Sequence, residues 1–191
     1  MGIRIDSTHL GAVKIISIET FEDARGIFME VYRADQFRAL GLPPTFLQDN
    51  HSRSGKNVLR GLHFQWDPPQ GKLIRTTAGT IFFVAIDIRR GSPTLGKWFG
   101  MEISAYSHKQ VWVPIGFASG FCALSEFAEV QYKCTDVYNK NSEGSILWND
   151  PKIGISWPIT RPILSQKDAN AQTLSDWLAS PNSETFQFQV S

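Results

Sequence analysis

Apolar and polar positions alternate along most of the chain in short runs. Segments rich in Val, Ile, Phe, Tyr and Thr recur about every eight to twelve residues, and turn-forming residues separate them. This spacing is typical of an all-β sandwich or barrel, in which each short run is one strand. The pattern predicts strands at residues 14–20, 26–32, 46–52, 58–64, 73–77, 80–87, 96–103, 110–113, 121–123 and 129–135.

Two segments have helical spacing instead. Residues 34–40 end at Gly41 with prolines close behind, which is a common way for a helix to stop. A second short helical piece is expected at residues 168–178. There is no internal repeat, low-complexity stretch or linker, so residues 1–191 are expected to form one domain. The mostly polar tail at residues 180–191 is expected to be a loosely held end.

Unpaired sheet edges constrain how so many short strands are arranged. Closure into a barrel or packing as a jelly roll hides those edges, so we expect an all-β jelly-roll barrel with a few short helices. Ala78 and Gly79 are expected to form a tight hairpin turn between two of the strands. A jelly roll has an open mouth where polar side chains on rigid strands converge, and a small-molecule site is expected there.

Composition and charge narrow the function classes. Apolar residues make up 42% and charged residues 19% of the 191 positions, which excludes disorder, collagen and coiled coil. The 19 basic and 18 acidic side chains give a net charge of +1, so neither nucleic acid nor an anionic membrane is expected as a partner. No apolar run approaches the roughly 18 residues of a membrane span, and the N-terminus has no secretory signal.

The two cysteines lie in apolar, strand-like runs. Cys122 and Cys134 have no spacing typical of metal ligation, so we expect them to be buried free thiols in a reducing compartment. Together with the missing signal, this predicts a cytoplasmic protein.

The densest polar stretch in the strand-like region spans residues 48–52 and 58–65. A single strand histidine such as His63 is commonly a structural residue. A ligand site is nevertheless favoured, because several polar side chains around it would be unusual to bury without a ligand: Gln48, Asn50, Arg60 and Lys72.

Strand alternation gives a specific expectation for this stretch. It places Arg60 and Leu62 on one face and Gly61 and His63 on the other, unless a bulge at Gly61 changes the register.

Nine segments, in one order and at one spacing, carry a resemblance to a known family. They are FEDARGIF (21–28), QDNHS (48–52), VLRGLHFQ (58–65), PPQGKLIR (68–75), VAIDIRRGSPTLGKW (84–98), PIGFASGF (114–121), QYKCTDVY (131–138), LWNDPKIGISWP (147–158) and ILSQKDA (163–169). Over about residues 10–175 the chain resembles the dTDP-4-dehydrorhamnose 3,5-epimerases.

The resemblance implies a cupin-type jelly roll, a homodimer that shares strands across its interface, and a reaction without metal or other cofactor. The residues themselves also argue against a metal site. Metal-binding cupins present a His-x-His pair and a further histidine after a Pro-x-Gly turn, whereas this chain has His63, Phe64 and Gln65 in the first motif and Ser119 in the second. One histidine cannot supply the usual three-nitrogen site.

The resemblance also implies the substrate and the catalytic residues. The substrate class is a nucleoside-diphosphate 4-keto-6-deoxyhexose, whose C4 ketone acidifies the hydrogens at C3 and C5. His63 matches the family's base, and Asp168 matches the carboxylate that orients it, although Asp is also a favoured helix cap. Tyr132 matches the acid on the opposite face of the ring, and Lys72 is expected beside the C4 oxygen.

Further positions match substrate-binding residues of the family. Arg25, Arg60 and Lys167 are the basic candidates for the diphosphate. Tyr138 matches the residue that stacks on the thymine ring. The positions matched around sugar and base are Glu30, Gln48, Asp49, Asn50 and Glu143, and Glu30 is expected to come from the partner subunit.

Two departures from the family pattern leave alternatives open. Ser119 stands where the family has histidine, and Phe83 stands where it has aspartate, both at positions that line the site. The enzyme could therefore invert only one carbon, or accept a CDP- or GDP-linked sugar. A jelly roll that binds sugar nucleotides without catalysis is the alternative from another class, and retention of His63, Asp168 and Tyr132 argues against it.

Overall fold

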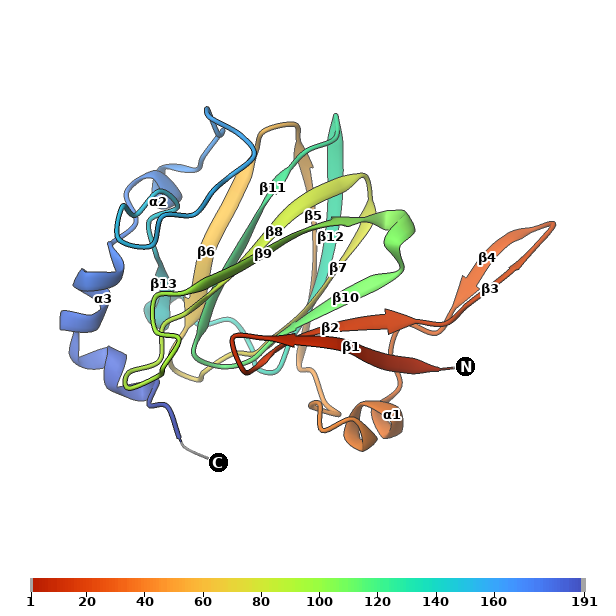
Figure 1. The fold of residues 1–191 in the computed structure, drawn as a ribbon, viewed down its shortest axis with the longest axis horizontal. Coiled ribbons are helices and arrows are strands. Elements are labelled where there is room, and N and C mark those ends of the chain that lie inside the picture. The colour runs from red at the N-terminus through yellow and green to blue at the C-terminus, as the bar shows by residue number, and fades with distance from the viewer. Residues whose placement is uncertain (1, 190–191) are drawn as a thin grey trace.

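The computed structural model describes residues 2–189, which form two facing β-sheets with a few short helices (Figure 1). The strands are β1 (Ile3–His9), β2 (Val13–Ile18), β3 (Thr20–Asp23), β4 (Gly26–Met29), β5 (Gln48–Gly55), β6 (Leu59–Gln65), β7 (Lys72–Ala78), β8 (Thr80–Asp87), β9 (Trp98–Ser104), β10 (Lys109–Val113), β11 (Phe117–Ala123), β12 (Phe127–Cys134) and β13 (Glu143–Ser145). One sheet has the order β1-β2-β10-β7-β12-β5, and the other has the order β13-β6-β11-β8-β9.

Alternation along the strands places one set of apolar side chains between the sheets. On β8, Ile81, Phe83 and Ala85 are fully buried in this inner core, while Val84 and Ile86 point to the outer face of the same sheet. The prediction of an all-β fold is confirmed, and every predicted strand overlaps an observed one.

The outer faces of both sheets are covered by helices. On the six-stranded sheet, α1 (Ala34–Ala39) buries Phe37 against Ile16 and Trp112, which confirms the helix predicted at residues 34–40. None of the helices within residues 2–189 is long and apolar enough to cross a membrane.

The second predicted helix is two helices, α2 (Gln166–Ala169) and α3 (Leu174–Ala179). The break has a local cause. Thr173 caps α3 in a capping box with Asp176, so its own backbone is extended and cannot continue a helix from α2.

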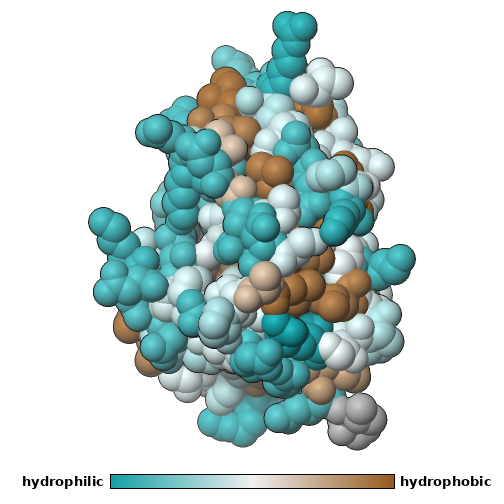
Figure 2. Space-filling model, turned by 90° about the vertical axis from the view of Figure 1, so that its left-hand side faces the viewer, coloured by the Kyte–Doolittle hydropathy of each residue, from teal (hydrophilic) through white to brown (hydrophobic). Residues whose placement is uncertain are grey.

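The expectation of a loosely held tail is wrong for the residues that the structure describes. A 3₁₀ turn (Pro181–Thr185) leads to Phe186, which is 3% exposed and lies against Trp177 and Phe64 on the outer face of the five-stranded sheet. The backbone N–H of Arg90 donates to the carbonyl of Phe186 at 2.7 Å. This side of the molecule, which carries α2 and α3, is mostly hydrophilic with small separate hydrophobic patches (Figure 2).

The expected hairpin at Ala78 and Gly79 is also wrong. β7 belongs to the six-stranded sheet and β8 to the five-stranded sheet, so the turn carries the chain from one sheet to the other. Gly79 is required there. Its φ of +72° favours glycine, and a Cβ would lie 2.2 Å from the carbonyl oxygen of Phe127.

A bulge at Gly61 sets the register of β6. Ser119 on β11 pairs with His63, whereas Phe121 pairs with Arg60, so β6 has one extra residue in this interval. As a result both Arg60 and His63 face the space between the sheets, and Leu62 points to the outer core. The sequence analysis allowed for a bulge at Gly61 that changes the register, and the structure confirms it.

Close approach of two backbones at this bulge predicts a stability effect. A Cβ on Gly120 would lie 2.5 Å from the carbonyl oxygen of Arg60 and 2.9 Å from Cα of Gly61. Gly120→Ala is therefore expected to lower the free energy of unfolding by about 1–3 kcal/mol, because backbone cannot yield as a side chain does. Gly55→Ala, at a strand glycine with open space around it, is the matched control. Equal denaturant midpoints for the two variants would contradict the prediction.

Candidate active site

A cleft with two lobes lies between the sheets. Both lobes are lined by His63, Lys72, Tyr132 and Glu143. The first, here called the apolar lobe, has a volume of about 220 Å³ and is completed by Ser52, Arg60, Ile74, Phe83, Ser119, Gly120, Phe121 and Val130. The second, here called the amide lobe, has a volume of about 250 Å³ and is completed by Gln48, Asn50, Phe64, Gln65, Gln70, Cys134 and Tyr138.

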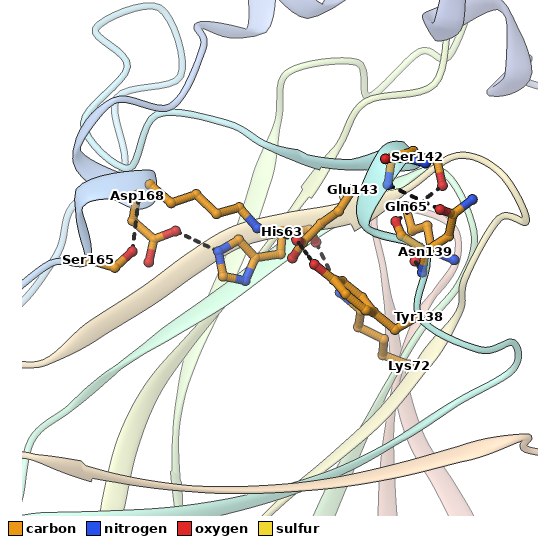
Figure 3. A network of polar contacts seen from close by, with 11 residues as sticks. His63, Gln65, Lys72, Tyr138, Asn139, Ser142, Glu143, Ser165 and Asp168 are labelled. Carbon is orange, nitrogen blue, oxygen red and sulfur yellow. Dashed lines mark hydrogen bonds and ion pairs between the residues drawn. The ribbon is translucent and has the colours of Figure 1, made fainter.

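A histidine that lines both lobes is bonded to a carboxylate behind it. His63 Nε2 lies 2.6 Å from Asp168 Oδ1, and the two side chains are 28% and 5% exposed (Figure 3). Burial raises the pKa of Asp168, but the hydrogen bond and charge of His63 together with the bond from Ser165 outweigh it, so the pKa is lowered overall. An ionised carboxylate only accepts, so Nε2 is the nitrogen that donates to it, and in the neutral form of the ring the lone pair lies on Nδ1.

The segment that carries Asp168 is fastened on both sides. Before it, Ile163 forms an isolated β-bridge with Val58, the residue before β6, and the N–H of Leu59 donates to the carbonyl of Ile163 at 3.0 Å. After it, the carbonyl of Gln172 accepts from the N–H of Leu147 at 2.8 Å.

The alternative that Asp168 itself caps a helix is wrong. Ser165 is the cap of α2, and its Oγ accepts from the N–H of Asp168 at 3.1 Å. The carboxylate is therefore free to turn toward His63.

Tyr132 and Lys72 approach the cleft from the opposite sheet. Tyr132 lies on β12 and Lys72 on β7, whereas His63 lies on β6. Burial raises the pKa of Tyr132, and burial lowers the pKa of Lys72 against the opposing effect of Glu143. Lys72 Nζ donates to the carbonyl of His63 at 3.3 Å. The cleft thus has an imidazole on one wall, and a phenol and the Lys72 amino group on the other.

Glu143 joins two candidate residues, Lys167 and Tyr138. It forms an ion pair with Lys167, and it accepts a hydrogen bond from the Tyr138 hydroxyl at 2.9 Å. Burial raises the pKa of Glu143, but the bonds from Lys167 and Tyr138 and the charge of His63 lower it overall. The N–H of Tyr138 donates to Gln48 Oε1 at 2.7 Å, and Gln48 in turn donates to Asn50 at 2.9 Å.

Four predicted binding residues do not line either lobe of the cleft in this chain. Lys167, on α2, is bonded to Glu143, which does line it. Arg25 is at the end of the β3–β4 pair, which projects from the body (Figure 1), and its guanidinium binds Asp23. Glu30 follows β4 and forms an ion pair with Arg33 at 3.5 Å. Asp49 points to the opposite face of β5 from Gln48 and Asn50, where its carboxylate binds Lys133 at 2.7 Å and accepts from Gln131 at 3.1 Å.

Both residues that depart from the family pattern line the apolar lobe. Ser119 is paired with His63 across β11 and β6 and is 6% exposed. Phe83 is fully buried beside Ile74 and Val130. The wall next to the histidine is therefore less polar on this side than on the amide side.

Several lining residues were not predicted from the sequence. They are Ser52, Phe64, Gln65, Gln70, Ile74, Gly120, Phe121, Val130 and Cys134. Strand alternation in the sequence could have identified two of them. Ser52 continues the alternation of Gln48 and Asn50 on β5, and Gln65 lies two residues beyond His63 on the same face of β6. Both cysteines are free and buried, as expected, but Cys134 also reaches the amide lobe.

No cluster within residues 2–189 has the three or more His, Cys, Asp or Glu side chains that could hold a metal ion. Glu143 and Asp168, the carboxylates nearest to His63, are each engaged by side chains of the chain itself.

Comparison with known proteins agrees with the sequence motifs. The family model described as dTDP-4-dehydrorhamnose 3,5-epimerase matches residues 7–176. A protein of that name from Salmonella typhimurium is 52% identical over 174 residues, which are 90% of this chain and 95% of the relative. The one from Neisseria gonorrhoeae is 51% identical over 170 residues, 88% of this chain, and this chain spans only 52% of its length.

A solved structure extends the likeness to the whole fold. The crystal structure of dTDP-6-deoxy-D-glucose-3,5-epimerase from Legionella pneumophila, in complex with dTDP-4-keto-L-rhamnose, has a TM-score of 0.92 and 43% identity. It covers 99% of this chain and 100% of its own. The expected cupin-type jelly roll is confirmed by this likeness. On the family match and these identities, the chain belongs to the dTDP-4-dehydrorhamnose 3,5-epimerase family, whose members are isomerases that act on carbohydrates.

Proposed function

We propose that the chain is a cofactor-independent epimerase of dTDP-4-dehydro-6-deoxyhexoses that inverts C3 and C5 through an enolate. The observation that carries the proposal is the bond between His63, on one sheet, and Asp168 of α2, with Tyr132 and Lys72 facing His63 from the other sheet. Inversion at a carbon beside a ketone needs a base on one face of the ring and an acid on the other. Two facing sheets can supply these groups from opposite sides.

In this mechanism Nδ1 of His63 removes the proton at C3 or C5. The Asp168 carboxylate holds the other ring nitrogen and stabilises the imidazolium that forms. Electron density moves to the C4 oxygen, where the Lys72 ammonium stabilises the enolate. Tyr132 then returns a proton to the carbon from the opposite face, and no redox step is involved.

The rest of the cleft fits the nucleotide end of such a substrate. Tyr138 is 53% exposed and presents its ring at the amide lobe, where it stacks on the base. Gln48 and Asn50 supply amide groups for the base, and Arg60 and Lys167 supply charge for the diphosphate. The dTDP-linked ligand of the Legionella pneumophila enzyme supports this nucleotide.

A homodimer with exchanged strands is part of the proposal. The projecting β3–β4 pair exposes Phe21, Ile27 and Phe28, an apolar surface that isolated monomers rarely present (Figure 1). Arg25 and Glu30 lie on and just after this pair, so exchange would carry both to the cleft of the partner subunit. Asp49 is not proposed as a contact, because Lys133 and Gln131 engage its carboxylate.

A single-centre epimerase is the second candidate, and the apolar lobe favours it. Ser119 and Phe83 offer the sugar one hydroxyl and no charge. A site that lacks partners for a hydroxyl loses discrimination for it, so the sugar could be held well for proton removal at only one carbon.

Proton NMR in D₂O tests the proposal and separates the two candidates. With dTDP-4-dehydro-6-deoxyglucose, EDTA and no added cofactor, we expect deuterium to enter at both C3 and C5. A rate at one carbon at least about a hundredfold below the other would favour the single-centre candidate. If deuterium enters at neither carbon, the epimerase function is contradicted and the non-catalytic binding module remains. If exchange occurs only when EDTA is omitted, the metal-free mechanism is contradicted.

A further inference from the structure

A buried glutamine connects the strand of His63 to the loop that carries Tyr138. Gln65 lies two residues after His63 on β6, is 2% exposed and lines the amide lobe. The loop spans residues 135–142 between β12 and β13. The reaction proposed above gives this side chain no role, and a buried amide that serves only packing would be costly without full hydrogen bonding.

Two of the three side-chain hydrogen bonds of Gln65 flank a single residue of that loop. Its Nε2 donates to the carbonyl of Val137 at 3.0 Å. Its Oε1 accepts from the N–H of Asn139 at 2.8 Å, and Figure 3 shows these two residues side by side. Val137 and Asn139 are the two neighbours of Tyr138. The second proton on Nε2 goes to the carbonyl of Pro68 at 2.8 Å, so both donors of the amide are used.

Tyr138 itself has little packing to hold it. Its side chain is 53% exposed, and the contacts that fix it are polar: its N–H donates to Gln48 and its hydroxyl donates to Glu143. A half-exposed ring cannot be oriented by a surrounding core. The bonds that Gln65 makes to the backbone on either side hold the loop segment that carries this ring, in addition to the two polar contacts of Tyr138 itself.

We propose that Gln65 is a positioning residue that fixes the Tyr138 ring for binding of the nucleotide, and thereby sets substrate affinity and not the chemical step. The inference rests on the function proposed above, in which Tyr138 stacks on the base. An aromatic platform gains most from stacking when it is already in place before the ligand arrives, because the ligand then spends no binding free energy on ordering it.

Gln65→Met tests the inference, since methionine has nearly the same length and cannot replace the three bonds. We expect the Kd for dTDP, measured by calorimetry, to rise about tenfold to a hundredfold. KM for the sugar nucleotide should rise in parallel, and kcat should stay within about threefold, because His63 and Asp168 keep their bond. Trp157→Phe is the control, since it removes one side-chain bond to a backbone carbonyl, that of Trp148, away from the cleft.

A double-variant cycle shows whether Gln65 acts through Tyr138. Tyr138→Ala alone should weaken dTDP binding, and adding Gln65→Met to it should weaken binding little further. Losses that multiply in the double variant, or a wild-type Kd for dTDP in Gln65→Met, would overturn the inference. If Gln65→Met does not fold, Gln65→Glu replaces it, because glutamate keeps the oxygen that faces Asn139 and loses the donated bonds. Wild-type affinity for dTDP in Gln65→Glu would likewise overturn the inference.

Failure of the proposed function would look different. The binding of dTDP is measured without turnover, so it reports on Gln65 and Tyr138 alone. Absence of deuterium exchange by the wild-type enzyme would contradict the epimerase mechanism, whatever the affinity of the Gln65 variants for dTDP.

Discussion

His63→Ala is expected to lower kcat by about a thousandfold or more while the protein stays folded. A positioned base contributes roughly 10²–10⁴-fold, and none of the other side chains that line the apolar lobe is an imidazole. The His63 side chain is 28% exposed and lines an open cleft, so its removal leaves no closed cavity in the core.

Asp168→Ala is expected to be severe but milder, with a loss of about a hundredfold or more. The imidazole then remains as a base, although neither its tautomer nor its orientation is fixed. Turnover is measured with the dTDP-linked 4-keto sugar, and circular dichroism verifies that each variant is folded. Wild-type turnover in His63→Ala would rule out its assignment as the base.

Tyr132→Phe is expected to stop net inversion while proton exchange with solvent continues. The substitution removes only the phenol oxygen, so the ring still fills its place beside Ile74 and Val130. His63 can remove a proton and return it, or a deuteron, on the same face, which gives exchange without inversion. In D₂O we expect the ratio of exchange to inversion to rise by about two orders of magnitude.

The control for this variant is Tyr106→Phe, at a tyrosine that is 84% exposed and outside the cleft. It should leave both rates unchanged. Equal losses of exchange and inversion in Tyr132→Phe would contradict the division between one base and one acid.

Strand positions were predictable because strands have local causes. The alternation of β-branched and aromatic residues over 80–87 reproduces the bounds of β8. β1 was missed because only Ile3 and Ile5 mark its apolar face, among Arg4, Asp6 and other polar residues. β13 has three residues and no large apolar side chain. Short or weakly apolar strands are formed by their partners and carry little signal of their own.

Features that depend on distant parts of the chain were not predictable. The turn at Gly79 has hairpin chemistry, but which sheet the next strand joins is decided by its pairing with β9 and β11. In the sequence Phe186 lies in a mostly polar tail. It is buried by Phe64 and Trp177, and Phe64 lies on a strand more than a hundred residues earlier, so no local pattern indicates the contact.

The sequence motifs predicted the residues at the centre of the site, but not all of the residues around them. His63, Lys72, Tyr132 and Glu143 line one cleft, with Asp168 bonded to His63 behind them. Gln65 was overlooked because a glutamine has no reactive group, and its value lies in bonds to Val137 and Asn139 across a loop. Arg25, Glu30 and Asp49 carry motif matches, yet one chain alone does not bring them into its cleft.

The central claim is that acid and base act on opposite faces of one sugar ring. A crystal structure of His63→Asn with the bound dTDP-4-dehydro sugar tests it most directly. We expect the asparagine to lie against C3 and C5 on one face of the ring, and the Tyr132 hydroxyl to lie within about 3.5 Å of the ring on the other, with Lys72 at the C4 oxygen. A sugar that has both residues on the same face, or that lies outside the cleft, would contradict the mechanism.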